Sequence, residues 1–164
     1  MARVLIHPAS YENVREAVNR AFELFPLELQ GKKVFIKPNV LRASEAQEAI
    51  VTNPAVMRAV VEKVESMSPA AIVVGDNPGL FNYGANELCF KQTGLMEAAK
   101  GYYRNIGNDS VQVAFNPDFM PVVSLSRIIL DADIIKPENE SLIMFTHCVL
   151  LPNYLFKSSG RGTH

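Results

Sequence analysis

Short apolar runs alternate with stretches of helical periodicity along the first half of the chain. Apolar residues, mainly valine and isoleucine, fill positions 4–6, 34–36 and 70–74, and each run is bounded by proline, glycine or polar residues. Runs of this length and composition predict buried strands. Between the first two runs, apolar residues recur every three or four positions over 14–25, which predicts an amphipathic helix capped by Ser10.

Further elements follow from the punctuation of the chain. Thr52-Asn53-Pro54 predicts a helix start, because asparagine caps helices and proline is tolerated in the first turn. Gly94 is expected to end a helix that starts near Asn86. The remaining expectations are a loop or loose helical turn over 41–50, a helix over 95–103, and strands over 111–115, over 121–125 and from 134.

The order strand, helix, strand, helix, strand is the pattern of βαβ units. Near-continuous apolar strands are typical of parallel sheets that helices cover on both faces. We therefore predict an α/β fold with a mostly parallel sheet and crossover helices on both faces. Right-handed crossovers would place every strand-to-helix loop on the same edge of that sheet.

Composition and charge exclude several classes of protein. The 164 residues suit one domain, and 48% hydrophobic residues favour a packed core over disorder. The formal net charge of −1 argues against nucleic-acid binding, and no run of 18 apolar residues predicts a membrane span. The two cysteines, Cys89 and Cys148, form no CxxC pair, so a reducing, cytoplasmic location is expected. We expect Cys89 to be a core residue.

Polar residues that could carry chemistry follow the ends of the predicted strands. Ligands of open parallel sheets bind outside the carboxyl ends of the strands, where His7, Lys37 and Asp76 fall. Lys37 would neutralise a carboxylate or phosphate, and Asn39 would orient it. The alternative is a turn with a solvated lysine and an asparagine that bonds its own loop.

The segment Gly75-Asp76-Asn77-Pro78-Gly79, which follows the third apolar run, has the composition of a turn. Asp76 would bind a cation, hold Lys37 or act as a base, whereas the alternative is that Asp76 and Asn77 only close the turn. Thr52 and Asn53 either cap a helix or present its free N–H groups to an anion. We expect no metal site at His147-Cys148, because adjacent residues rarely face one centre. The glycines form neither a dinucleotide fingerprint nor a P-loop.

Four motifs follow one another along the chain: Val34-Phe35-Ile36-Lys37-Pro38-Asn39-Val40, Thr52-Asn53-Pro54, Ile72-Val73-Val74-Gly75-Asp76-Asn77-Pro78-Gly79 and Leu130-Asp131-Ala132-Asp133-Ile134-Ile135. This ordered set resembles the family called domain of unknown function number 362, over roughly residues 2–135. The resemblance implies an α/β domain with Lys37, Asn39 and Asp76 at the site, and an association with ferredoxin-type iron–sulfur modules and redox or cofactor chemistry.

Residues 136–164 depart from that resemblance. Family members look to continue with Pro-Lys-x-Lys-Thr-His and a later Gly-x-x-Lys-Asn, whereas here only Thr146-His147 resembles the first motif. We expect a divergent segment from a truncated or frameshifted reading frame, ending in an unstructured tail, which would leave the domain incomplete. No iron–sulfur cluster is expected on this chain itself, because two cysteines cannot hold one.

Two hypotheses for the function follow. The chain is an enzyme, or the N-terminal half of one, that binds a small anionic or carbonyl-containing ligand at the strand ends through Lys37, Asn39 and Asp76. The alternative is a non-catalytic fragment or interaction module, which would self-associate through an unpaired sheet edge or an exposed apolar face. The sequence names no cofactor, and no nucleic acid or membrane is expected as a partner.

Overall fold

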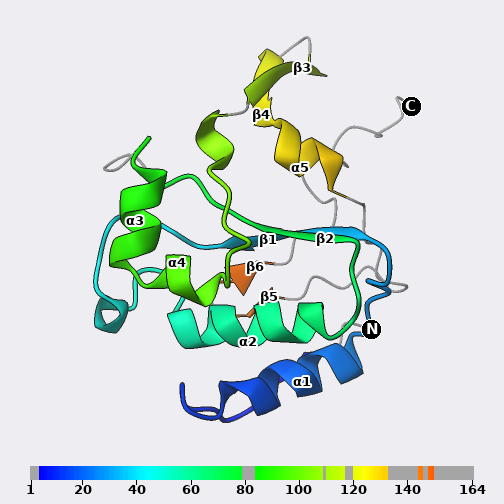
Figure 1. Cartoon of the computed structure of the whole chain (residues 1–164), viewed down its shortest axis with the longest axis vertical. Helices are drawn as coiled ribbons and strands as arrows, with labels where there is room; N and C mark the ends of the chain where they lie inside the picture. Colours follow the sequence, from blue (N-terminus) through cyan, green and yellow to red (C-terminus); the bar gives the residue numbers. More distant parts are fainter. Residues whose placement is uncertain are drawn as a thin grey trace, which may run out of the picture.

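The computed structural model describes residues 4–78, 84–108, 110–116, 120–132, 144–145 and 148–149 (Figure 1). Its elements in chain order are α1 (Val14–Leu24), β1 (Lys33–Pro38), the 3₁₀ helix η1 (Ala46–Glu48), α2 (Pro54–Glu65), β2 (Ala71–Val74), α3 (Asn86–Gln92), α4 (Leu95–Ala98), the 3₁₀ helix η2 (Ile106–Asn108), β3 (Ser110–Asn116), β4 (Met120–Ser126), α5 (Arg127–Asp131), β5 (Met144–Phe145) and β6 (Cys148–Val149).

A β1–α2–β2 unit forms the centre of the molecule. β1 and β2 pair in parallel, with Lys33 opposite Ala71 and Ile36 opposite Val74, and α2 is the crossover between them. β6 pairs antiparallel with the other edge of β1, and β5 with β6, so the sheet order is β2-β1-β6-β5. The predicted α/β class is confirmed, and the parallel part of this sheet is the β1–β2 pair.

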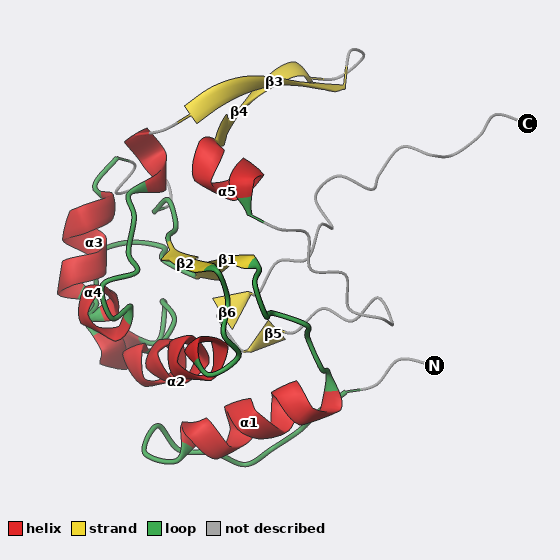
Figure 2. Ribbon diagram, turned by 45° about the vertical axis from the view of Figure 1, so that its right-hand side comes forward, coloured by secondary structure: helices red, strands yellow, loops and turns green. Residues whose placement is uncertain are grey.

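Helices lie on both sides of the parallel pair. Figure 2 shows α1 and α2 below β1 and β2, and α5 above them. The centre of β1 is buried between these layers, since Val34, Phe35 and Ile36 are 3%, 9% and 0% exposed. Burial on both faces is the physical reason that this strand is apolar without alternation.

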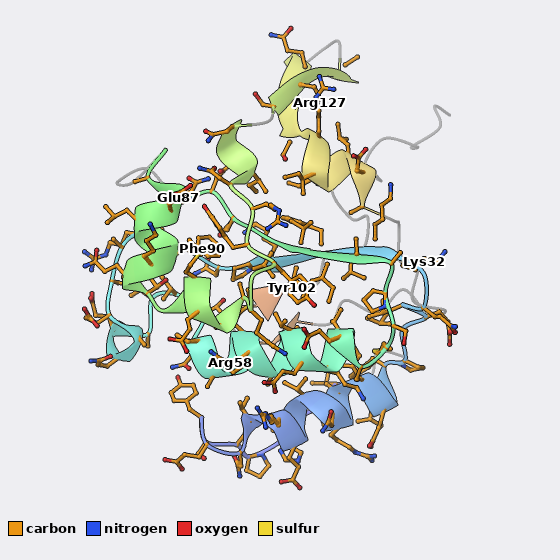
Figure 3. The ribbon with its side chains drawn as sticks, in the orientation of Figure 1. Lys32, Arg58, Glu87, Phe90, Tyr102 and Arg127 are labelled. Atoms are coloured by element: carbon orange, nitrogen blue, oxygen red, sulfur yellow. The ribbon has the colours of Figure 1, made fainter. Side chains whose placement is uncertain are left out.

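The core lies mainly between the sheet and the α2, α3 and α4 helices. Val60 and Val64 of α2 and Phe90 of α3 are fully buried there, and Figure 3 shows Phe90 on the inner side of α3. Val56 of α2 and Met67, just beyond the end of this helix, are only partly buried. The prediction that Cys89 is a core residue is confirmed, because its side chain is 0% exposed.

The strands predicted after residue 110 form a separate hairpin. β3 and β4 pair antiparallel from Ser110 opposite Ser126 to Asn116 opposite Met120. Both strands were expected, but they make a two-stranded sheet of their own rather than extending the parallel pair. A short connection between them allows antiparallel pairing only, since a parallel pair needs a long crossover.

The predicted strand over residues 4–6 is wrong. The segment makes no strand, and Val4 and Ile6 are 80% and 91% exposed. A strand needs a partner for its backbone N–H and C=O groups, and both edges of β1 are already taken by β2 and β6. His7 consequently follows no strand; its ring Nδ1 lies 2.8 Å from the carbonyl oxygen of Pro8.

Two predicted helices have different limits in the structure. α1 begins at Val14 with Asn13 as its N-cap residue, and Ser10 instead donates its backbone N–H to Asn13 Oδ1 at 2.7 Å. The helix expected over 95–103 ends at Ala98, because Lys100 and Gly101 have φ of 52° and 86°, outside helical geometry. η1 confirms the helical turn expected within 41–50.

Some sequence predictions fall outside the described residues. These are the strand from 134, the divergent segment over 136–164 with its tail except for β5 and β6, and the side chains of His147 and Cys148. No helix in the described ranges combines the length and the apolar character needed to cross a membrane.

Candidate functional site

The carboxyl ends of the two parallel strands bring Lys37 and Asp76 together. Lys37 lies near the end of β1, and Asp76 follows the last residue of β2 by two positions. Parallel strands end on the same edge of a sheet, so residues 39 positions apart in sequence become neighbours. Lys37 Nζ lies 2.8 Å from Asp76 Oδ1, which is the distance of a charge-assisted hydrogen bond.

Asp76 is almost completely enclosed. Its side chain is 6% exposed, and Asp76 Oδ2 accepts the backbone N–H of Val40 at 2.8 Å. Burial raises the pKa of this carboxyl, whereas Lys37 and the backbone N–H groups of Val40 and Asn77 act to lower it. Of the roles expected for Asp76, holding Lys37 is the one for which the contact is present.

Lys37 is more open than its partner. Its side chain is 35% exposed, and its ammonium also lies 3.4 Å from the carbonyl oxygen of Pro38. An ammonium group carries three N–H donors, and the described surroundings of Lys37 take at most two of them. Lys37 is therefore a cation with donor capacity to spare at the edge of the sheet.

Asn39 and Thr52 hold the loop between β1 and α2. The backbone N–H of Asn39 donates to Thr52 Oγ1 at 2.8 Å, and the backbone N–H of Thr52 donates to the carbonyl oxygen of Asn39 at 2.9 Å. The Asn39 side chain donates to the carbonyl oxygen of Ile50 at 3.1 Å. These bonds stabilise the loop, and a ligand-binding role for either residue stays a prediction.

Asn53 confirms the predicted helix start. It is the N-cap residue of α2, and Asn53 Oδ1 accepts the backbone N–H of Ala55 at 2.9 Å. Pro54 occupies the first helical position, where a missing N–H leaves no hydrogen bond unmade. The structure thus shows the capping alternative for Asn53, and anion binding at this helix start stays a prediction.

Asn77 belongs to a group of three side-chain amides that sequence reasoning found only in part. Asn86 Nδ2 donates to Asn77 Oδ1 at 2.7 Å and to Asn105 Oδ1 at 2.8 Å. Asn86 is the first residue of α3 and is 1% exposed. An asparagine at a predicted helix start indicates a cap, and nothing in the sequence indicates that Asn105 lies beside it.

Asn105 reaches this edge because its segment runs alongside β2. Val74 donates its N–H to the carbonyl oxygen of Tyr102, and Arg104 donates its N–H to the carbonyl oxygen of Val74, both at 2.9 Å. These bonds form a parallel bridge between Val74 and Tyr103. Three parallel segments therefore end at one edge, where they bring Lys37, Asp76 with Asn77, and Asn105.

The geometry offers hydrogen-bond donors for oxygen atoms. Among the residues that the structure describes, no three His, Cys, Asp or Glu side chains group as metal ligands. Cys89 is buried, and desolvation raises the pKa of its thiol, so it is poorly suited to act as a thiolate.

The comparison with protein families fits this architecture. A family model described as "Domain of unknown function (DUF362)" matches residues 34–135. The chain belongs to the DUF362 family. The match begins within β1, so the DUF362 region contains the Lys37–Asp76 pair and all three amides, but not α1. No curated protein and no solved structure matches the chain.

Proposed function

We propose that the carboxyl edge of the β1–β2 pair binds a small ligand through a carboxylate or carbonyl oxygen, with Lys37 as its principal donor. The observation that carries this proposal is the 2.8 Å pairing of a 35% exposed lysine with a 6% exposed aspartate. Asp76 fixes the ammonium from the inner side and leaves its outer side open to solvent. Asp76 is thus a positioning residue in this proposal.

The charge of the pair narrows the class of ligand. Lys37 and Asp76 together are neutral when both are ionised, so they supply no net positive charge for a multiply charged anion. Enclosing uncompensated charge is unfavourable. A monocarboxylate or a neutral carbonyl compound requires less compensation than a phosphate dianion, and we place it first among the anionic and carbonyl ligands considered for this edge.

A binding experiment on a matched set of variants tests the proposal. The probes are acetate, pyruvate and inorganic phosphate. Their binding is measured by thermal shift and by ¹H–¹⁵N NMR spectra of the labelled protein. Lys37→Met removes the proposed donor, and Lys32→Met is the control with the same change of charge. Lys32 is exposed and precedes β1 at the opposite end of the strand (Figure 3).

The expected result is that a carboxylate probe binds to the wild type and to Lys32→Met, and at least about tenfold more weakly to Lys37→Met, as for loss of a hydrogen bond to a charged group. Lys37→Met/Asp76→Asn removes both charges and separates loss of binding from loss of folding. Equal binding by the wild type and both Lys37 variants, or no binding of any probe to the folded wild type, would overturn the proposal.

Self-association is a second candidate function, and the exposure of Val4 and Ile6 favours it. These side chains are 80% and 91% exposed in a segment with strand-like sequence. A second copy of the chain could cover them by strand pairing. Val4→Lys/Ile6→Lys is then expected to convert a dimer into a monomer in light scattering, whereas Leu88→Lys, at a 56% exposed position on α3, leaves the dimer intact. A monomeric wild type would exclude this function.

A further inference from the structure

Hydrogen bonds fix the orientation of the three side-chain amides of Asn77, Asn86 and Asn105 at the carboxyl edge. Asn86 is buried, and both N–H groups of its side chain are engaged, one by Asn77 Oδ1 and one by Asn105 Oδ1. Asn105 Oδ1 also accepts the backbone N–H of Gly107 at 3.0 Å. The carbonyl oxygens of Asn77 and Asn105 are therefore both held toward Asn86.

A side-chain amide is planar, and its oxygen and nitrogen diverge from the same carbon atom. When the oxygen is held on Asn86, the NH₂ group of the same side chain is directed to a different position. Asn77 is exposed and Asn105 is half-buried. Neither donates a hydrogen bond to any residue in the described ranges.

The burial of the Asn86 side chain costs free energy. Asn86 Oδ1 is buried and accepts no hydrogen bond from the described part of the chain. Leaving such an acceptor unpaired costs about 1–3 kcal/mol. A leucine or methionine would fill a buried site without this cost, but it would remove the donor that holds Asn77 Oδ1 and one of the two donors that hold Asn105 Oδ1.

Two glycines lie in close contact with this group of residues. A Cβ atom at Gly107 would lie 3.0 Å from Asn86 Nδ2 and 3.1 Å from Asn77 Oδ1. A Cβ atom at Gly75 would lie 2.9 Å from the carbonyl oxygen of Arg104. Glycine at both positions lets the segment around Asn105 pack directly against the end of β2.

We propose that Asn77 and Asn105, oriented by Asn86, form a pair of hydrogen-bond donors for a carboxylate oxygen of the ligand. This inference rests on the proposed function and extends it. β1, which carries Lys37, and the segment that leads to Asn105 both pair with β2, which leads to Asp76 and Asn77. The edge then presents donors from three parallel segments, which suits a small carboxylate with a second oxygen atom, such as a 2-oxo acid.

Aspartate substitutions test this proposal with little change of shape. In Asn77→Asp and Asn105→Asp, one carboxylate oxygen still accepts from Asn86, while the NH₂ donor becomes an acceptor. Asn108→Asp introduces the same charge at an exposed position of the same loop and is the matched control. Asn77→Ala and Asn105→Ala remove the donor without adding charge. The probes are pyruvate and acetate, and their binding is measured by NMR titration of the backbone and side-chain amide signals.

We expect each Asn77 and Asn105 variant to weaken pyruvate binding about tenfold or more, while Asn108→Asp changes it less than about threefold. The wild-type side-chain NH₂ signals of Asn77 and Asn105 should also shift on titration. Loss of binding in Lys37→Met with unchanged binding in all Asn77 and Asn105 variants would overturn the inference and leave the proposed function standing. Loss only in the asparagine variants would overturn the role of Lys37 and keep the amide pair. If pyruvate and acetate do not bind to the folded wild type, the amide pair is only a structural element of the loop.

Discussion

Replacing Lys37 with methionine is expected to destabilise the fold because it leaves Asp76 ionised and enclosed. Removing one partner of a buried ion pair costs about 3–5 kcal/mol. Lys37 is 35% exposed, so solvent already screens part of this interaction, and we expect a loss of about 2–3 kcal/mol. For a chain of this size, that loss lowers the midpoint of thermal unfolding by about 4–12 °C.

The stability that Lys37→Met loses depends on pH, and the pKa of Asp76 determines the direction of this dependence. Burial raises this pKa above the ordinary value of 3.8, and Lys37 acts to lower it, so Lys37→Met raises it further. The folded state then binds a proton more readily than the unfolded state, and the free energy of unfolding falls as pH rises from the ordinary value through the raised one. The difference in the free energy of unfolding between the wild type and Lys37→Met is thus smaller at about pH 4.5 than at about pH 7.5.

Urea unfolding of the wild type, Lys37→Met, Asp76→Asn and the double variant measures this effect. The double variant has no buried charge at the pair, so its loss should be smaller than the sum of the single losses by about 1–3 kcal/mol. Additive losses, or a deficit of Lys37→Met that is equal at both pH values, would refute the assignment of Lys37 as the partner that stabilises the Asp76 carboxylate.

Three further substitutions probe the surroundings of the site. Thr52→Val leaves the backbone N–H of Asn39 without its acceptor and should cost about 1–3 kcal/mol. Thr93→Val removes a hydroxyl donor that the carbonyl oxygens of Cys89 and Phe90 share, and it should cost less. Asn53→Ala removes the cap of α2 and should cost about 1 kcal/mol, against little change for the exposed Asn19→Ala. Tyr103→Phe should leave stability unchanged or higher, because the buried Tyr103 hydroxyl has no partner in the described structure; a loss above about 1 kcal/mol in calorimetry would show that the hydroxyl is bonded.

The strands and helices that the sequence predicted correctly share strong local signals. β1 and β2 are apolar runs between breakers, and α2 begins at an Asn-Pro pair that caps the helix. The strand expected over 4–6 had the same apolar composition but found no partner, since neighbouring edges decide whether an apolar run becomes a strand. Composition alone carries no information about which edges are taken.

The site was predictable as far as the positions of polar residues at the strand ends, whereas the strand order that brings these residues together was not. Lys37 and Asp76 were expected at strand ends, and the parallel pairing of β1 and β2 brings them within 2.8 Å. Asn105 was not predictable, because its place beside Asn77 depends on a two-bond parallel bridge after Tyr102. Such a bridge is too short to leave a periodic pattern in the sequence.

The α/β class, the parallel βαβ unit and the polar residues at the ends of β1 and β2 follow from the amino-acid sequence, because apolar periodicity and turn residues act over a few neighbouring positions. Which of those polar residues meet depends on the tertiary structure. Enclosure of Asp76 to 6% exposure, the ion pair with Lys37 and the direction of the three amides each require segments that are 9 to 39 positions apart. Burial and hydrogen-bond satisfaction are properties of the packed chain, and they fix these directions only once the strands have paired.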